Sequence, residues 1–367
     1  MKILIAGDWH SELHEKAVYQ ACAALGHEVH RFAWHAYFRP VAASSALAGA
    51  ASLFSRRFQN KFLVGPLMTR LNRDLVATAV RIRPDLVFVY RGTHVLPQTL
   101  LAVRNALPET MLVGYNNDDP FGPQQPRHLW RHFLRCLPRY DVVLAYRHHN
   151  LDEYKSHGAR CVRLLRSWFM PERNHPVTLT ESDRERFASD VVFIGHYEND
   201  GRLECLEEIV KQGYKLRLFG PGYDWDPVLA RSRWLKNLRP VQLVWGEDYN
   251  KALCGAKIAL CFFSRLNRDT YTRRCFEIPA TGTMMLCEYS DDAASLYGAG
   301  HEADFFDSKE NLVAKIARYM ADDALRDGVA AAGLKRVWAD GHDVNSRMRR
   351  LLQWLCDTQK PHASTHA

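Results

Sequence analysis

Two parts of the sequence follow the same plan. Each has a short apolar run that ends in glycine, a polar loop, a helical stretch closed by a second glycine, and another apolar run. These glycines are Gly7 and Gly26 in the first copy and Gly195 and Gly213 in the second. The first equivalent pair is 188 residues apart and the second pair is 187 apart, so the internal spacing is nearly conserved. A repeated β-α-β opening predicts two domains of one type in tandem.

Further short apolar runs alternate with helical periods in both halves. They are 85–90, 111–115 and 141–145 in the first half, and 241–245, 258–263 and 283–287 in the second. Strands that alternate with helices form parallel sheets covered on both faces. We therefore predict an α/β protein with two Rossmann-like domains, and we expect its ligands at the carboxyl ends of the strands. The same architecture fits binding proteins, epimerases and dehydrogenases, so fold alone does not settle function.

The domain boundary is marked by a change in composition. A chain of 367 residues exceeds the size of about 250–300 residues at which a single core stops growing. The stretch 171–189 is polar and punctuated by proline, which is typical of a linker. We place the first domain at 1–170, the second at 190–357 with a last helix at 343–357, and a disordered tail at 358–367.

Composition narrows the class of protein without choosing a function. Hydrophobic residues make up 47% and charged residues 25%, which are globular values. The nine cysteines include no Cys-x-x-Cys pair, and with no signal peptide and no long apolar segment they indicate a reduced, cytoplasmic protein. The net charge of +8 favours acidic ligands. Because the arginines are spread along the chain, we do not expect nucleic acid as a partner.

One basic stretch raises the question of membrane contact. Residues 46–67 combine apolar side chains with Arg56, Arg57 and Lys61. A helix of this kind can rest on an anionic membrane, which would place the protein peripherally at the inner face. The pattern also fits a helical insertion that lines a cleft, which is the interpretation we favour.

The strongest local signal for a ligand site lies in segment 267–283, which reads as a loop, a helix and a glycine stop before a strand. Thr270 or Thr272 can cap this helix, whose free N–H groups and positive dipole end then form an anion site. Arg273 and Arg274 lie in the first turn, where cations are unfavourable unless an anion such as a diphosphate compensates them.

Glu277 follows Arg273 by four residues and shares its helical face. Two interpretations are open. The two side chains can form an ordinary surface pair, or the carboxylate can accept hydrogen bonds from ribose hydroxyls while the arginines hold a diphosphate.

Several motifs resemble one known family, the CgeB-like, group-1-type glycosyltransferases of the GT-B fold. The likeness covers about residues 190–352. The segments that carry it are Arg274-Cys-Phe-Glu-Ile-Pro-Ala-Thr-Gly282, Asn267, Gly300-His-Glu302, Asp304-Phe-Phe306 and, in the first half, Asn117-Asp-Asp-Pro-Phe121. The resemblance implies a GT-B enzyme whose two Rossmann-like domains face each other across a cleft. The N-terminal domain would bind the acceptor and the C-terminal domain the nucleotide-diphosphate sugar.

The resemblance also implies roles for individual residues. Glu277 would bind the ribose, and Arg274 or Arg202 the diphosphate. Trp245 and Gly246 would contact the base. The full set of donor-binding positions is Gly195, Arg202, Gly220, Gly222, Trp245, Gly246, Asn267, Arg273, Arg274 and Glu277.

This chain departs from the family pattern at two positions. Most relatives have cysteine where Thr281 stands, and many have a small residue where His196 stands. Both departures leave the detail of the donor pocket open.

Sugar transfer requires stabilisation of a diphosphate leaving group and, in an inverting enzyme, a base for the acceptor hydroxyl. Arginines and a helix end can supply that charge, so we expect no metal and no cofactor beyond the donor. The acidic cluster 116–119 contains Asp118 and Asp119; it can supply the base, bind a metal, or cap the turn before Pro120.

His10 is the other candidate base, because it lies in the loop after the first strand. With Asp8 it can instead shape the turn and cap the helix. His10 and His14 have the spacing of zinc ligands, but no third ligand is evident. Arg91 and His94 follow another strand and, with Asp8, are expected on the acceptor side, although they also fit a solvated loop face.

We therefore predict a glycosyltransferase that acts on a glycan, a lipid-linked sugar or a protein. The rival hypothesis is a non-catalytic protein that binds nucleotide sugars. A dehydrogenase is disfavoured because the first strand lacks Gly-x-Gly-x-x-Gly after it. The base and sugar of the donor, the acceptor, the stereochemical course and the oligomeric state stay open.

Overall fold

The computed structural model describes residues 1–40 and 46–359. The chain divides into two compact units. The first holds Met1–Arg166 together with the segment that begins at Val344, and the second holds Ser167–Asp343. Each unit contains one sheet in which all paired strands are parallel. The prediction of two parallel α/β sheets is confirmed.

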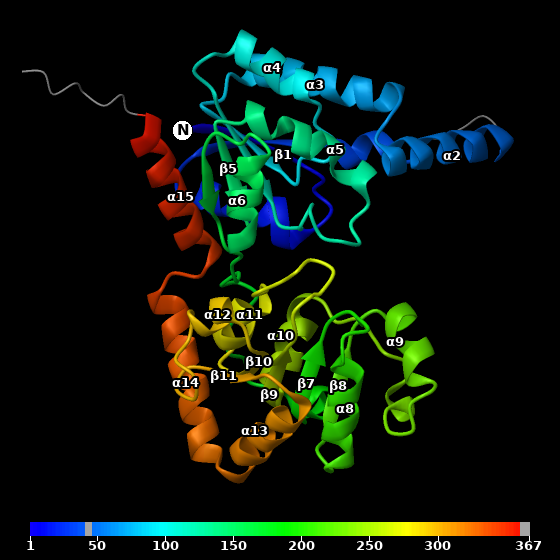
Figure 1. The fold of residues 1–367 in the computed structure, drawn as a ribbon, viewed down its shortest axis with the longest axis vertical. Helices are drawn as coiled ribbons and strands as arrows, with labels where there is room; N and C mark the ends of the chain where they lie inside the picture. The colour runs from blue at the N-terminus through cyan, green and yellow to red at the C-terminus, as the bar shows by residue number, and fades with distance from the viewer. Residues whose placement is uncertain (41–45, 360–367) are drawn as a thin grey trace, which may run out of the picture. The chain divides into compact units, whose positions relative to one another are not determined.

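The first sheet has six strands in the order β2-β1-β3-β4-β5-β6. Figure 1 labels two of them, β1 and β5. The central strands of this sheet are buried along their whole length and almost entirely apolar, as expected of a sheet covered on both faces. The strands are β1 (Lys2–Gly7), β2 (Glu28–Ala33), β3 (Leu86–Tyr90), β4 (Met111–Asn116), β5 (Val142–Ala145) and β6 (Val162–Leu164). Strand β6 has three residues, too few for the period of two to reveal it in the sequence.

The helices of the first unit follow the strands in alternation. They are α1 (Ala17–Ala24), α2 (Ala46–Phe62), α3 (Pro66–Ile82), α4 (Pro97–Ala106), α5 (Arg127–Cys136), α6 (His148–Ser156) and α15 (Val344–Gln359). Short turns of other helix types lie at Glu12–Lys16, Trp34–Phe38 and Leu137–Arg139.

The second sheet has five strands in the order β11-β10-β9-β7-β8. They are β7 (Ser189–Ile194), β8 (Leu216–Phe219), β9 (Ala256–Cys261), β10 (Met284–Glu288) and β11 (Asp304–Phe306). The helices are α7 (Glu181–Phe187), α8 (Arg202–Lys211), α9 (Gly222–Leu229), α10 (Gly246–Cys254), α11 (Arg274–Ala280), α12 (Asp291–Ala294), α13 (Lys309–Ala321) and α14 (Asp323–Ala339), with a 3-10 turn at Lys236–Leu238.

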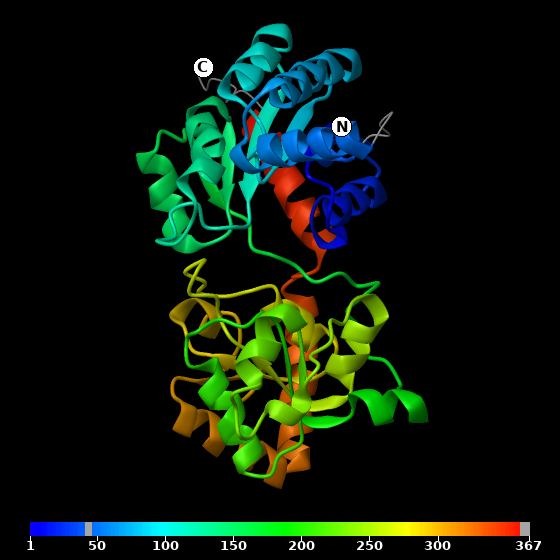
Figure 2. The same cartoon turned by 90° about the vertical axis from the view of Figure 1, so that its right-hand side faces the viewer.

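The last helix, α15, belongs to the first unit and not to the second domain, which was predicted to extend to residue 357. It packs against α1, and Figure 2 shows it in red against the upper unit. Met348 and Leu355 on this helix are buried. The helical period of the sequence predicts that α15 has an apolar face. It does not predict which unit this face packs against. Residues 360–367 of the predicted tail lie outside the described residues, and residues 358 and 359 end α15.

Two predicted elements differ in the structure. Residues 241–245 form no strand; they meet the sheet only through a bridge between Phe219 and Gln242, just after Pro240, which has no N–H to donate to a ladder. The helical stretch predicted between Gly7 and Gly26 is divided into a turn at Glu12–Lys16 and α1, because His14 inside this turn has non-helical dihedral angles. Glu15 in that turn points inward, where its carboxylate accepts the Asp8 N–H at 2.8 Å.

No helix among the described residues is both long and apolar enough to cross a membrane.

Candidate functional site

The carboxyl edge of the second sheet brings together two glycine loops and the start of α11. A Cβ atom at Gly195 would lie 2.8 Å from Nη2 of Arg274, and one at Gly220 would lie 2.2 Å from the carbonyl oxygen of Gly195. The indole Nε1 of Trp225 donates to that same carbonyl at 2.8 Å. A side chain at Gly220 would meet backbone, and one at Gly195 would displace the guanidinium of Arg274. The structure thus places three predicted donor-binding residues in one cluster.

Gly222 meets a similar restriction, since its Cβ would lie 2.8 Å from the carbonyl oxygen of Val241. Next to this loop, His196 Nδ1 lies 2.6 Å from Asp224 Oδ2. This contact directs the His196 ring toward α9, and most of the His196 side chain is exposed.

The Gly220 loop allows a direct stability test. Replacing Gly220 by alanine should destabilise the protein by about 1–3 kcal/mol, since the new methyl group meets backbone that cannot rotate away. Thermal unfolding would show a lower Tm, by about 2–4 °C per kcal/mol. Gly328→Ala is the matched control: it lies in α14 with nothing near its Cβ position, and should be neutral or stabilising. An unchanged Tm for Gly220→Ala would contradict the packing described.

Glu277 is buried at the first turn of α11, with 6% of its surface exposed. Its Oε2 accepts a hydrogen bond from the Tyr249 hydroxyl at 2.7 Å. Burial and the neighbouring Glu277 carboxylate raise the pKa of Tyr249 well above its ordinary value, so the phenol remains a donor. A buried carboxylate held by a phenol on α10 differs from the surface Arg–Glu pair that was one of the two open interpretations.

Tyr249 connects Glu277 to the loop that opens α10. Trp245 caps the amino end of this helix and 66% of its surface is exposed. Gly246 follows with a φ of 56°, a conformation that favours glycine. An exposed indole beside a glycine is a suitable stacking surface for a planar ring.

Arg202 has a different environment from the one its predicted role requires. Its Nε donates to Asp200 at 2.8 Å and its Nη1 donates to the carbonyl of His196 at 2.6 Å. Nη2 donates to Asp200 and to the carbonyl of Phe263. The side chain is buried, so Arg202 ties β7, α8 and the end of β9 together, and most of its N–H groups are already engaged by Asp200 and backbone carbonyls.

The remaining donor-binding predictions lie around the start of α11. Arg273 is the residue that precedes the helix, and its guanidinium lies 5.8 Å from the Trp168 ring centroid. The Asn267 N–H donates to Ser264 Oγ at 3.3 Å. Of the two predicted caps, Thr272 accepts the Arg274 N–H at 3.4 Å, whereas the Thr270 hydroxyl donates to Asp292.

In the first unit, the acidic cluster lies at the carboxyl end of β4. Asp118 Oδ2 pairs with Arg91 Nε at 2.9 Å, so two predicted site residues meet. Asp119 is fully buried, and its Oδ1 accepts the Phe121 N–H and an Asn150 N–H, both at 3.0 Å. Asp119 therefore shapes the turn around Pro120, one of the roles left open by the sequence.

His149, which sequence reasoning missed, lies beside Asp119. Its Nε2 is 3.3 Å from Asp119 Oδ2, and part of its ring is exposed. It stands in the first turn of α6, directly after β5, so the rule that ligand sites follow strands could have found it. Glu153 one turn later completes a group whose ligand atoms lie within 4.8 Å of one another. The arrangement suits either a histidine oriented by a carboxylate or a metal site.

The other first-unit candidates are less well placed. His94 is buried, with Nε2 2.8 Å from Asn60 Oδ1, and burial lowers its pKa to about 3. It is a neutral interior residue without access to an acceptor.

His10 is exposed and lines a cavity of about 670 Å³ together with Trp9 and Tyr19. The carbonyl group of Asp8, the other residue predicted in this loop, contacts the His35 ring.

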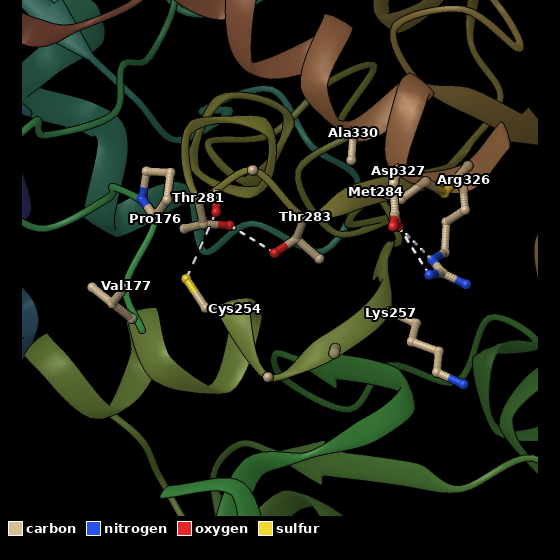
Figure 3. Close-up of a pocket in the computed structure, with 13 residues that line it drawn as sticks. Pro176, Val177, Cys254, Lys257, Thr281, Thr283, Met284, Arg326, Asp327 and Ala330 are labelled. Atoms are coloured by element: carbon tan, nitrogen blue, oxygen red, sulfur yellow. Dashed lines mark hydrogen bonds and ion pairs between the residues drawn. The ribbon is translucent and has the colours of Figure 1, made fainter. Parts of the chain in front are cut away.

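Two cavities open on the second unit. One of about 420 Å³ lies at the carboxyl ends of β10 and β11, lined by residues that include Arg202, Arg265 and Lys309. The other, of about 330 Å³, lies at the amino ends of β9 and β10 (Figure 3). Thr281 lines the second cavity, with Oγ1 2.7 Å from the Ile278 carbonyl oxygen. The departure from the family pattern at Thr281 is therefore at the edge of the sheet opposite to Glu277.

The cysteines are free thiols throughout the described residues. Cys261, Cys275 and Cys287 nevertheless meet in the interior, with sulfur atoms within 4.8 Å of one another. They come from three separate elements, β9, α11 and β10, which is why spacing in the sequence did not reveal the group.

Comparison with known proteins shows which family the second half of the chain resembles. Residues 202–353 match a family model described as glycosyl transferase-like. That segment includes the Gly220 loop, Trp245 and α11. The chain therefore has the GT-B fold, and its second half is similar to the glycosyl transferase-like family. No curated protein matches its sequence.

Solved structures of similar fold cover nearly the whole of this chain. HepE from Anabaena, in complex with UDP and glucose, has 14% identity and a TM-score of 0.66, covering 97% of this chain and 100% of its own. Sucrose-phosphate synthase from Thermosynechococcus elongatus has 13% identity and a TM-score of 0.67, covering 98% and 99%. A putative UDP-N-acetylglucosamine 2-epimerase from Listeria monocytogenes has 13% identity and a TM-score of 0.57, covering 97% and 96%. These likenesses show the fold alone.

Proposed function

We propose that this protein is a glycosyltransferase that uses a nucleoside-diphosphate sugar as donor and a glycan, a lipid-linked sugar or a protein as acceptor. The observation that carries the proposal is the cluster at the carboxyl edge of the second sheet, where buried Glu277 and Arg274 lie at the start of α11. Because HepE was solved with UDP and with UDP-glucose, a uridine donor is the first choice. The CgeB-like subfamily is proposed on the motif of α11.

Within this cluster, each group has a distinct task. The Glu277 carboxylate accepts hydrogen bonds from the ribose hydroxyls, since Tyr249 occupies only one of its oxygens. Arg274 stabilises the diphosphate, because Arg202 is engaged by Asp200. Trp245 stacks on the base. As the bond to the sugar breaks, charge grows on the diphosphate, and a positioned guanidinium stabilises that charge.

In the first unit, we propose His149 as the base that accepts the proton of the acceptor hydroxyl. A histidine held through one ring nitrogen by a buried carboxylate has a fixed orientation, and the carboxylate stabilises the imidazolium that forms. Asp118 is less suitable because it pairs with Arg91, and His10 has no orienting carboxylate among its described contacts. A base of this kind corresponds to an inverting enzyme.

We propose that no metal ion takes part. Arg274 supplies the positive charge for the leaving group, and Asp119 already accepts N–H donors from Phe121 and Asn150, which a metal ligand would have to share. Turnover should therefore be unchanged when EDTA replaces magnesium in the assay. Loss of turnover in EDTA, restored by manganese or magnesium, would instead assign Asp119, His149 and Glu153 as metal ligands.

The donor proposal is tested by thermal unfolding with UDP, GDP, dTDP, CDP, ADP and NAD. A ligand at about 100 times its Kd stabilises the folded state by about 2.7 kcal/mol. We expect a rise in Tm of several degrees with one diphosphate, UDP before the others. A shift with NAD alone would favour a dehydrogenase, and no shift with any of them would contradict the donor site.

Glu277→Ala should weaken binding of that nucleotide. A hydrogen bond to a charged group contributes about 1.5–3 kcal/mol, so the Kd should rise roughly 10- to 150-fold, as measured by calorimetric titration. Glu247→Ala is the matched control, since Glu247 lies on α10 but is exposed and paired with Lys251. If both variants bind as the wild type does, Glu277 does not contact the ribose.

A further inference from the structure

Helix α2 exposes a row of phenylalanines. Phe54, Phe58 and Phe62 are spaced four residues apart, so they lie on one face of the helix. The exposed fractions of these residues are 73%, 48% and 37%. The rings of Phe58 and Phe62 are in contact, with centroids 4.7 Å apart. Exposed aromatic side chains grouped in this way mark a surface for a partner or a membrane.

The opposite face of α2 is anchored to the first unit by polar contacts. Arg56 Nη1 donates to the Tyr37 carbonyl at 2.7 Å, and Asn60 Oδ1 lies 2.8 Å from His94 Nε2. Gln59 is buried and its Oε1 accepts the Leu67 N–H at 2.9 Å. These contacts fix the rotation of the helix about its axis, so the phenylalanines are directed away from the unit. Figure 1 shows α2 extending beyond the neighbouring α5.

The charge around this face has one sign. Arg57 and Lys61 are exposed beside the phenylalanines, and α5, which contacts α2, carries Arg127, Arg131 and Arg135. Neither helix contains an acidic residue. Residues 29–73 include seven arginines and lysines and no aspartate or glutamate. A long run without acid is unexpected in a chain with 41 acidic residues.

We infer that the exposed face of α2 docks on an anionic lipid surface. Phenylalanines on one face of a helix enter the boundary between headgroups and acyl chains, while neighbouring cations meet the lipid phosphates. A second copy of the chain is a poorer occupant, because pairing this face with itself would bring together cations from α2 and α5. The same exposure disfavours the cleft-lining interpretation that the sequence alone favoured. This inference does not depend on the donor site, and it suits a lipid-linked acceptor.

Co-sedimentation with sucrose-loaded vesicles tests the inference with the full-length protein. We expect binding to vesicles of phosphatidylcholine with phosphatidylglycerol, little binding to phosphatidylcholine alone, and loss of binding in 0.5 M salt because exposed charges are screened. The double variant Phe54→Ser/Phe58→Ser should weaken partitioning on the order of a hundredfold. Arg57→Gln/Lys61→Gln should weaken it about fivefold for each charge removed.

Matched controls lie elsewhere on the molecule. Leu101→Ser removes an exposed apolar residue from α4, and Lys309→Gln removes an exposed cation from the second unit. Both should bind vesicles as the wild type does, and all variants should keep the wild-type Tm, which separates docking from folding.

Three results would overturn the inference. The first is equal binding by the wild type and the phenylalanine double variant. The second is a dimer in light scattering that this double variant makes monomeric, which would assign the face to a second copy. The third is loss of acceptor use in the double variant with vesicle binding intact, which would return α2 to the acceptor site.

Discussion

His149→Ala is expected to lower kcat by about 10²- to 10⁴-fold, the usual contribution of a positioned general base. The Kd for the donor nucleotide should be unchanged, because His149 lies in the first unit and the donor groups lie in the second. Steady-state kinetics with saturating donor, combined with titration of the nucleotide, separates the two effects. Asp119→Asn should also lower kcat, since the amide cannot stabilise an imidazolium as a carboxylate does.

The neighbouring histidine offers a close control for this prediction. His148 stands in the same turn of α6, and its Nε2 lies 3.0 Å from Arg166 Nη2. His148→Ala should keep most of the activity. If His10→Ala lost activity while His149→Ala kept it, the base would be His10. If neither substitution lowered kcat, the enzyme would not depend on a histidine base, as expected for a retaining reaction.

Arg202→Ala is expected to destabilise the protein by about 3–5 kcal/mol, because it leaves the Asp200 carboxylate buried without its partner. Denaturant unfolding should show a lower midpoint with a similar slope. Part of the loss should be recovered in Arg202→Ala/Asp200→Ala, which removes both charges. The matched control is Arg265→Ala: the Arg265 side chain is largely exposed where it pairs with Glu288, so this pair should contribute at most about 1 kcal/mol.

The same substitution decides between two roles for Arg202. The structural role requires a large loss of stability and an indirect loss of nucleotide binding. An Arg202→Ala protein of normal stability that fails to bind nucleotide would show that the arginine contacts the diphosphate, as the family resemblance implied.

The sheets and the donor loops could be predicted because they depend on local patterns. Short apolar runs alternating with helical periods specify parallel sheets, and glycine at a strand end marks close backbone approach. The repeat that linked Gly7 to Gly195 therefore gave the correct fold class. The rule that ligand sites follow strands also pointed to Asp118, and it would have reached His149 had it been applied to β5.

Other features depend on contacts between distant parts of the chain, which no local pattern records. The hydrogen bond between Tyr249 and Glu277 joins helices α10 and α11. Arg202 pairs with Asp200, which lies two residues before it, outside the helix. Helical spacing predicts neither of these two contacts. The phenylalanines on α2 are exposed because Tyr37 and His94 contact the opposite face of this helix, through Arg56 and Asn60. The return of α15 to the first unit similarly depends on a surface formed by α1.

The most direct test of the account is turnover with uridine-diphosphate sugars. The purified protein would be incubated with each donor and a library of glycan, lipid-linked and protein acceptors, while released UDP is quantified and acceptors are weighed by mass spectrometry. The account predicts acceptor-dependent release of UDP, a mass gain of one glycosyl unit on one acceptor class, and loss of both in Glu277→Ala. Binding of UDP in the same preparation with no glycosylated product from any donor would contradict it and favour a non-catalytic nucleotide-sugar-binding protein.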